Sequence, residues 1–260
     1  GLLEYSQGGP NEREQYYTNQ IRPYYRAPHI WVGFPARYVD RGWVDGTKHL
    51  PAQKERQYRA EKQTRYGSAV TDAVFITSRD GKIFRQWPDA FLQPGLRTAK
   101  NWAYGDNYIA WQLIETASVF DDQPREMSLF ATEDYFTGTS SRLRRYTLRL
   151  DGFVSFHAPA AGGEFITKPL IFDGSTLLLN MGTSAAGSIR IEIQSPDGTP
   201  LDGFALDDCE EIFGNAINYP VSWKNERQLN ELAGQPVRLR FVLFEADVYA
   251  FQFVEKSLTE

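Results

Sequence analysis

The sequence is poor in several features that would restrict its function. Its 260 residues include one cysteine, Cys209, so the chain cannot form an internal disulfide or a zinc site made of several thiolates. No apolar run approaches the about 20 residues that a membrane-spanning helix needs, and we expect no membrane span. The formal net charge is −5, which argues against a nucleic-acid-binding protein, because such proteins usually carry a basic surplus.

Sequence signals for cofactors and metals are also lacking. We find no glycine loop of the kind that binds phosphate and no Gly-x-Ser-x-Gly nucleophile turn. His49 and His157 have no partners at metal-ligand spacing, so we predict neither a metal site nor a cofactor. Cys209 lies in "DDCEE", where acidic neighbours disfavour the thiolate form and argue against a nucleophilic role.

The first half of the chain contains two related pairs of strand-like segments. "APHIWVGFPARY" from Ala27 resembles "DNYIAWQLIETA" from Asp106, and "AVFITSRDG" from Ala73 resembles "MSLFATEDY" from Met127. The segments from Ala73 and Met127 each run into a turn that carries an aspartate. The first unit is longer because of residues 41–67, an expected inserted loop with a short polar helix from about Ala52 to Tyr66.

Repeated strand pairs predict a partial β-propeller over residues 1–141. A lone hairpin cannot bury its faces, whereas stacked hairpin units are typical of propeller blades. About two blades are visible, but a propeller needs roughly four to eight, so upstream blades or self-association would have to complete it. The chain begins with Gly1 instead of Met, and we expect sequence upstream of it to be missing. An open sheet built from two hairpins is the alternative.

The second half, residues 142–260, predicts an antiparallel β-sandwich. Alternating or apolar segments such as "RLRRYTLRLDGFVSFHAP" and "GSIRIEIQSPDGTPLDGF" are separated by Asp-Gly, Gly-Gly and Pro-Asp-Gly turns. Short strands with turns at this spacing are typical of sandwiches. Within this half a helical signal occurs only around residues 225–233, and the fold class we predict for the chain is all-β.

Together these segments resemble uncharacterised bacterial proteins that are grouped loosely with the N-terminal domain of glycoside hydrolase family 32. The resemblance rests on "YRAPHIWVGFPARY", "TDAVFITSRDGKIFRQW", "NWAYGDNYIAW", "LRRYTLRLDGFVSFHAPAAGGEFITKPLIF" and "SAAGSIRIEIQSPDGTPLDGFALDDCEEIFG". The family combines a five-bladed β-propeller with a C-terminal β-sandwich. It implies a carbohydrate or polysaccharide as partner, hydrolysis of glycosidic bonds, and an extracellular or periplasmic location.

The resemblance places a sugar site at the inner strand ends of the propeller. Family hydrolases use carboxylates there, one protonated and one ionised. Arg26 precedes Ala27 and Pro28 where the family has Arg-Asp-Pro, so the motif Asp is absent, as are the Trp-Met-Asn-Asp-Pro and Glu-Cys-Pro motifs. Asp106 takes the corresponding position in the next unit and is the candidate catalytic carboxylate. Further carboxylates would have to come from outside this chain.

The remaining candidate site residues would bind the sugar: Arg26, His29, Asn107, Trp102 and Tyr108. Arg26 and His29 could bind an acidic sugar, and an aromatic face suits the apolar side of a pyranose ring. Structural roles in turns, hydrogen bonds and the core are the alternative for each of them. Two functional hypotheses follow: a carbohydrate-active protein that hydrolyses glycosidic bonds, or a non-catalytic glycan-binding, structural or assembly module.

Overall fold

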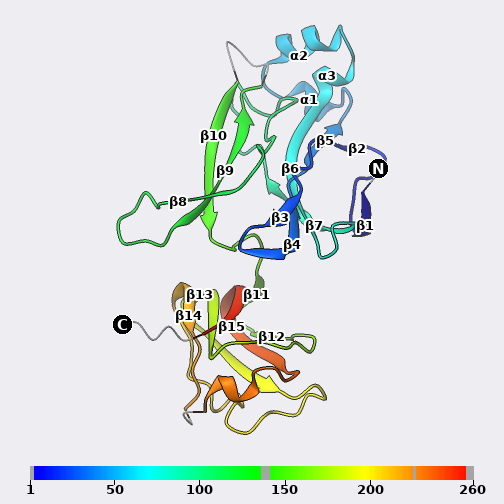
Figure 1. The fold of residues 1–260 in the computed structure, drawn as a ribbon. Helices are drawn as coiled ribbons and strands as arrows, with labels where there is room; N and C mark the ends of the chain where they lie inside the picture. The colour runs from blue at the N-terminus through cyan, green and yellow to red at the C-terminus, as the bar shows by residue number, and fades with distance from the viewer. Residues whose placement is uncertain (1–2, 136–140, 225–226, 256–260) are drawn as a thin grey trace. The chain divides into compact units, whose positions relative to one another are not determined.

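The computed structural model describes residues 3–135, 141–224 and 227–255, and it confirms the all-β class (Figure 1). The chain divides into two compact units. Unit 1 contains residues 1–116 and 127–147, and unit 2 contains residues 117–126 and 148–260. Their sheets are compatible with a partial propeller and a sandwich.

Unit 1 is built on a seven-stranded sheet in the order β1-β7-β6-β4-β3, with β5 pairing β6 and β2 pairing β5. Its pairings are antiparallel except for β1 with β7. β4 and β5 are successive partners of β6, separated by Phe34 and Pro35, because proline has no N–H to donate to a ladder. The strands are β1 (Glu4–Gln7), β2 (Glu14–Tyr16), β3 (Arg22–Tyr24), β4 (Ala27–Gly33), β5 (Ala36–Asp40), β6 (Ala69–Ser78) and β7 (Ile83–Leu92).

The predicted aspartate turn closes the hairpin of β6 and β7. Oδ1 of Asp80 accepts hydrogen bonds from the N–H groups of Lys82, at 2.8 Å, and Ile83, at 2.9 Å. Oγ of Ser78 accepts from the N–H groups of Asp80 and Gly81. Asp80 is therefore a structural residue, as short polar side chains in turns usually are.

The insertion folds into three short helices instead of one. They are α1 (Asp45–Lys48), α2 (Gln53–Ala60) and α3 (Arg65–Ser68). Arg56 of α2 is fully buried and donates hydrogen bonds to the carbonyls of Pro51, Gly67 and Trp102. One arginine therefore ties the insertion to the loop that carries Trp102.

A three-stranded sheet, in the order β10-β9-β8, completes unit 1. Its strands are β8 (Ile114–Thr116), β9 (Glu126–Glu133) and β10 (Arg142–Arg149). The expected strand from Asp106 is shorter than predicted, because the chain there forms turns with positive φ at Gly105 and Asn107. An isolated bridge between Ile109 and Ala131, flanked by backbone hydrogen bonds of Asn107, Tyr108 and Ala110, joins this stretch to β9 before β8 begins.

Unit 2 is organised by two long strands, β13 (Thr176–Gln194) and β15 (Arg238–Val254). They pair antiparallel over almost their full length, and the register shifts between Asn180 and Met181 and, over a longer stretch, between Thr183 and Ser188. The chain continues as one strand through this longer irregularity, which includes the segment "GTSAAG". The other elements are β11 (Phe156–Ala158), β12 (Gly163–Ile166), β14 (Asn215–Pro220) and the 3-10 helix η1 (Leu229–Leu232).

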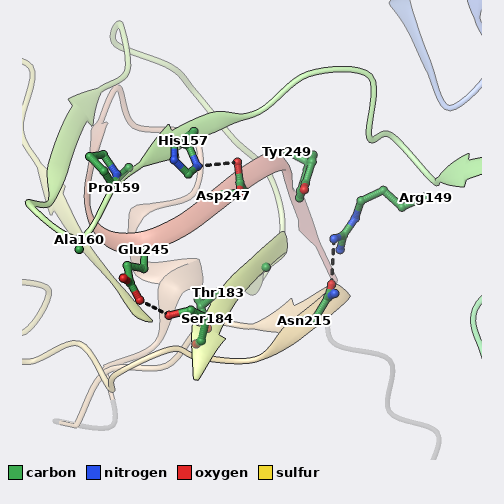
Figure 2. A pocket seen from close by; sticks show the side chains of 12 residues that line it. Arg149, His157, Pro159, Ala160, Thr183, Ser184, Asn215, Glu245, Asp247 and Tyr249 are labelled. Atoms are coloured by element: carbon green, nitrogen blue, oxygen red, sulfur yellow. Dashed lines mark hydrogen bonds and ion pairs between the residues drawn. The ribbon is translucent and has the colours of Figure 1, made fainter. Parts of the chain in front are cut away.

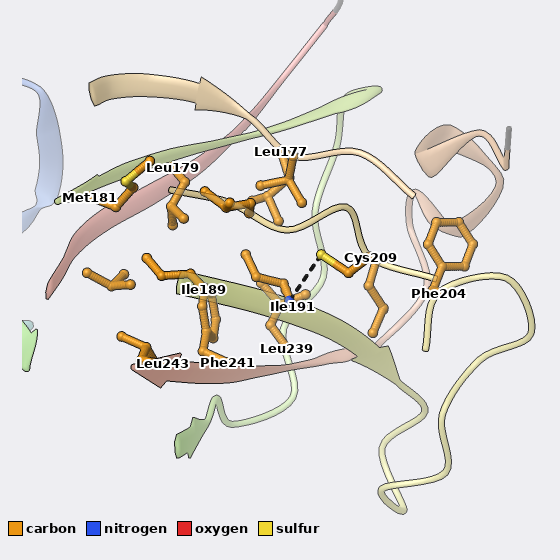
Figure 3. Close-up of a cluster of buried hydrophobic side chains, with 14 of the residues drawn as sticks. Leu177, Leu179, Met181, Ile189, Ile191, Phe204, Cys209, Leu239, Phe241 and Leu243 are labelled. Carbon is orange, nitrogen blue, oxygen red and sulfur yellow. Dashed lines mark hydrogen bonds between the residues drawn. The ribbon is translucent and has the colours of Figure 1, made fainter. Parts of the chain in front are cut away.

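The core of unit 2 lies between the two halves of these long strands. Figure 3 shows Leu177, Leu179 and Met181, from the first half of β13, facing Ile189 and Ile191 from its second half. Leu239, Phe241 and Leu243 of β15 continue the second layer, and Phe204 and Cys209 close one end. The two layers of this sandwich therefore share their principal strands, and the register shift marks the passage from one layer to the other.

Candidate functional site in unit 2

A cavity of about 520 Å³ lies in unit 2 at the register shift of β13 and β15 (Figure 2). This volume is within the range of about 300–1,000 Å³ that small-molecule sites occupy. The lining combines charged, amide, hydroxyl and aromatic side chains. They are Arg149, His157, Thr183, Ser184, Asn215, Glu245, Asp247 and Tyr249, together with Ala158, Pro159, Ala160 and Gly182.

A row of four residues crosses the sheet beneath the cavity. Gly182 of β13 is the register partner of Asn215 on β14 and of Asp247 on β15. Asp247 is in turn paired with His157 of β11. Directly paired residues project from the same face of a sheet, so a glycine separates two polar side chains. The missing side chain at position 182 leaves the space between Asn215 and Asp247 open.

Arg149, the last residue of β10, borders one end of this row. Its guanidinium donates to Oδ1 of Asn215 at 2.8 Å and to the carbonyls of Met181 and Ala216 at 3.1 and 2.9 Å. The guanidinium carbon lies 4.3 Å from the centre of the Tyr249 ring, a cation–π distance. Three neutral acceptors and one aromatic face therefore hold Arg149 in a single orientation.

Two carboxylates border the other end of the cavity. Oδ1 of Asp247 accepts from Oγ of Ser155 at 2.7 Å and lies 3.2 Å from Nδ1 of His157. Oε2 of Glu245 accepts a hydrogen bond from Oγ of Ser184. The second oxygens, Oδ2 of Asp247 and Oε1 of Glu245, accept no hydrogen bond from a described residue. The cavity thus offers unused acceptors at this end.

Close backbone packing fixes the strand geometry beside the cavity. A Cβ at Gly187 would lie 2.5 Å from the carbonyl oxygen of Glu245 and 2.8 Å from that of Phe244. Glu245 itself has a φ of 41°, in the left-handed region that non-glycine residues rarely adopt. Glycine at position 187 and the strained backbone of Glu245 together allow the irregularity that directs Glu245 into the cavity.

The sequence-predicted catalytic residue, Asp106, lies in unit 1 and is 2% exposed. Its carboxylate oxygens accept hydrogen bonds from the N–H groups of Tyr135, at 2.8 Å, and Ala103, at 3.2 Å. Burial raises the pKa of Asp106 to about 6, and the two N–H groups oppose that shift. The adjacent Asn107 is equally buried and donates to the carbonyl of Thr71 at 3.0 Å.

The other predicted site residues have varied surroundings. Arg26 and His29 are exposed, beside and within β4. Trp102 is half-buried, and its indole N–H donates to the carbonyl of Gly95 at 2.9 Å. Tyr108 is also half-buried; its ring contacts that of Tyr17, and burial raises its pKa.

The register of β6 separates these residues into two groups. Trp31 of β4 pairs with Ser78 at the end of β6, and Arg26 lies further along in that direction. Asp106 and Asn107 contact Thr71, near the start of β6. Seven residues of extended strand separate Thr71 from Ser78, a distance of roughly 23 Å. The structure therefore brings Asp106 together with Asn107, and neither of them with Arg26.

Sequence reasoning missed the cavity of unit 2. Its one usable signal was Gly182 within the apolar run "LLLNMG", because glycine inside a strand often marks a bulge or a close approach. His157 was considered only as a metal ligand. No group of three or more His, Cys, Asp or Glu side chains in the described ranges is arranged to hold a metal ion. No helix in the same ranges is long and apolar enough to span a membrane.

Comparison with known proteins adds one structural similarity. No protein-family model matches the chain, and no curated protein matches it. The chain is similar to a glycoside hydrolase family 43 arabinoxylan arabinofuranohydrolase from Bacillus subtilis, whose structure was solved in complex with cellotetraose. The TM-score is 0.26 at 9% sequence identity, over 97% of this chain and 44% of that protein. The chain thus spans less than half the length of the hydrolase, which belongs to family 43 and not to family 32.

Proposed function

We propose that this chain is a carbohydrate-active protein that binds a glycan in the cavity of unit 2. The observation that carries the proposal is the row Asn215–Gly182–Asp247–His157, in which a glycine opens a space between planar polar side chains. Amide and carboxylate groups form hydrogen bonds with hydroxyl groups in both directions. The Tyr249 ring adds an apolar surface of the kind on which a pyranose can lie.

Rigidity supports a binding role. Arg149 is held by three hydrogen bonds and by the Tyr249 ring, and Asp247 is held by Ser155 and His157. Groups that are already ordered lose little conformational freedom when a ligand binds, which favours affinity. The same side chains would fix the orientation of a sugar ring over Gly182.

The test is titration of the full chain with a panel of oligosaccharides, monitored by calorimetry. Gly182→Val places methyl groups in the open space; a Cβ at this position would already lie 3.6 Å from Oδ1 of Asn215 and 3.7 Å from Nη1 of Arg149. We expect the substitution to abolish binding while the strand is retained, because valine favours strands. The proposal fails if no glycan binds the wild type, or if Gly182→Val binds equally well.

Hydrolysis of glycosidic bonds is a second candidate function, with Asp106 as the acid. Its support is the pKa of about 6, since a raised carboxyl pKa suits a general acid. Asp106 uses both carboxylate oxygens within its own loop and is 2% exposed, so a substrate would need that loop to open. Product analysis after incubation with polysaccharides, for wild type and Asp106→Asn, tests this role. Release of sugars by the variant at the wild-type rate would exclude it.

A further inference from the structure

We infer that the cavity of unit 2 selects sugars that carry a free ammonium group, that is, amino sugars that are not N-acetylated. This inference rests on the proposed glycan-binding function and narrows its ligand class. It depends on how charge and hydrogen-bonding capacity are distributed along the cavity lining.

The charges of the lining do not balance. Glu245 and Asp247 contribute two carboxylates and Arg149 contributes one guanidinium, so these three side chains together carry a net negative charge. No Lys or Arg of the described ranges forms an ion pair with either carboxylate. A cationic group that enters the cavity therefore gains a favourable electrostatic interaction, and an anionic group does not.

The hydrogen-bonding groups left unused at the carboxylate end of the cavity are acceptors. Most donors of Arg149 are already engaged by Asn215, Met181 and Ala216, and its Nε is buried without a partner. By contrast, Oε1 of Glu245 and Oδ2 of Asp247 accept nothing in the described part of the chain. Free acceptors on two carboxylates suit an ammonium group, which has three donors and no acceptor.

The two ends of the cavity also define how a bound sugar ring would be oriented. Asn215 donates no hydrogen bond through its side-chain amide to any described residue, so that amide can donate to a sugar oxygen. Figure 2 shows Glu245 and Asp247 on the side of the cavity opposite Asn215, and Gly182 lies between Asn215 and Asp247 in the strand register. A sugar ring would therefore direct oxygens toward Asn215 and an ammonium group toward the carboxylates.

The experiment compares three oligosaccharides of equal length by calorimetry at low salt: a fully deacetylated glucosamine oligomer, its N-acetylated counterpart and a neutral glucose oligomer. We expect the deacetylated oligomer to bind about tenfold tighter than the other two, since two exposed ion pairs each add a small increment. This preference should decrease at high salt, because exposed charges are screened.

Substitutions assign the preference to its residues. Glu245→Gln and Asp247→Asn, combined, should remove the tenfold preference, so that the deacetylated and the glucose oligomers bind this variant with equal affinity. Glu210→Gln, which neutralises an exposed carboxylate outside the cavity, is the matched control and should preserve it. Equal or tighter binding of the N-acetylated or glucose oligomer overturns the amino-sugar inference and leaves the glycan site intact. If none of the three oligomers binds, at low or at high salt, both the amino-sugar inference and the proposed glycan site are overturned.

Discussion

The guanidinium carbon of Arg149 lies 4.3 Å from the centre of the Tyr249 ring, and the same guanidinium bonds Asn215 and two backbone carbonyls. β13, β14 and β15 are therefore joined at one side chain. Because no carboxylate in the described ranges pairs with Arg149, its role is to hold these strands around the cavity.

Replacement of Arg149 by alanine is expected to lower the free energy of unfolding of unit 2 by about 2–4 kcal/mol, through loss of three hydrogen bonds and the aromatic contact. Arg149→Lys should retain little of this stabilisation, because an ammonium group cannot reproduce the planar arrangement of donors of a guanidinium. Urea denaturation followed by circular dichroism measures both. A fully stable Arg149→Lys variant would show that charge alone matters.

Gly187→Ala is expected to destabilise unit 2 by roughly 2–3 kcal/mol, the cost of forcing backbone to move in a packed region. Its Cβ would lie 2.5 Å from the carbonyl oxygen of Glu245, which is backbone and cannot rotate away. Gly182→Ala is the matched control, since its nearest atoms are at ordinary contact distance. Thermal unfolding of the two variants should therefore differ clearly, and equal melting temperatures would contradict the packing argument.

Arg56→Met should destabilise unit 1 by roughly 3–5 kcal/mol, because three backbone carbonyls lose a buried charged donor. We expect the insertion at residues 41–67 to become sensitive to proteases, since Arg56 links it to the Trp102 loop. Lys54→Met, an exposed substitution on the same helix, controls for the change in charge and composition. Limited proteolysis with mass spectrometry locates the cuts, and unchanged protection in Arg56→Met would disprove the link.

The stability of unit 1 should decrease as pH rises from about 4 to 7. Burial raises the pKa of Asp106 from 3.8 to about 6, so the folded state binds a proton that the unfolded state releases. This contribution is complete below pH 4 and is lost as pH rises through 6; it amounts to roughly 3 kcal/mol at most.

Asp106→Asn removes this ionisation, so the difference in unfolding free energy between wild type and variant should follow that pH course. Five of the six tryptophans lie in unit 1, so tryptophan fluorescence during urea unfolding reports mainly on this unit. A difference that stays constant between pH 4 and 7 would show that Asp106 titrates normally.

The sequence predicts the elements of this fold better than their arrangement. Strand alternation and Asp-Gly turns indicate the all-β class, and the turn at Asp80 follows from local hydrogen bonding alone. The length of β13 does not follow from the sequence, because glycine and alanine in "GTSAAG" are typical of loops, whereas pairing with β15 extends the strand through them. Tertiary pairing overrides local propensity here.

The candidate site could not be found by the same reasoning. Asn215, Gly182, Asp247 and His157 come from four strands, and only the register of those strands aligns them. Register depends on the packing of the whole sheet, and a shift of one residue would move every side chain to the opposite face. Asp106 was predicted as catalytic because it takes the position in the second unit that corresponds to the Arg26-Ala27-Pro28 motif, yet the structure shows that its carboxylate holds its own loop.

The continuity of β13 and β15 through both layers has a thermodynamic consequence. β13 and β15 line the cavity and also carry core residues of both layers. A ligand that fits the cavity therefore binds only when both layers are assembled. Occupancy at a hundred times the dissociation constant would add about 2.7 kcal/mol to the unfolding free energy. Protection from heat should then extend to backbone amides throughout the sandwich, far beyond the atoms that touch the sugar.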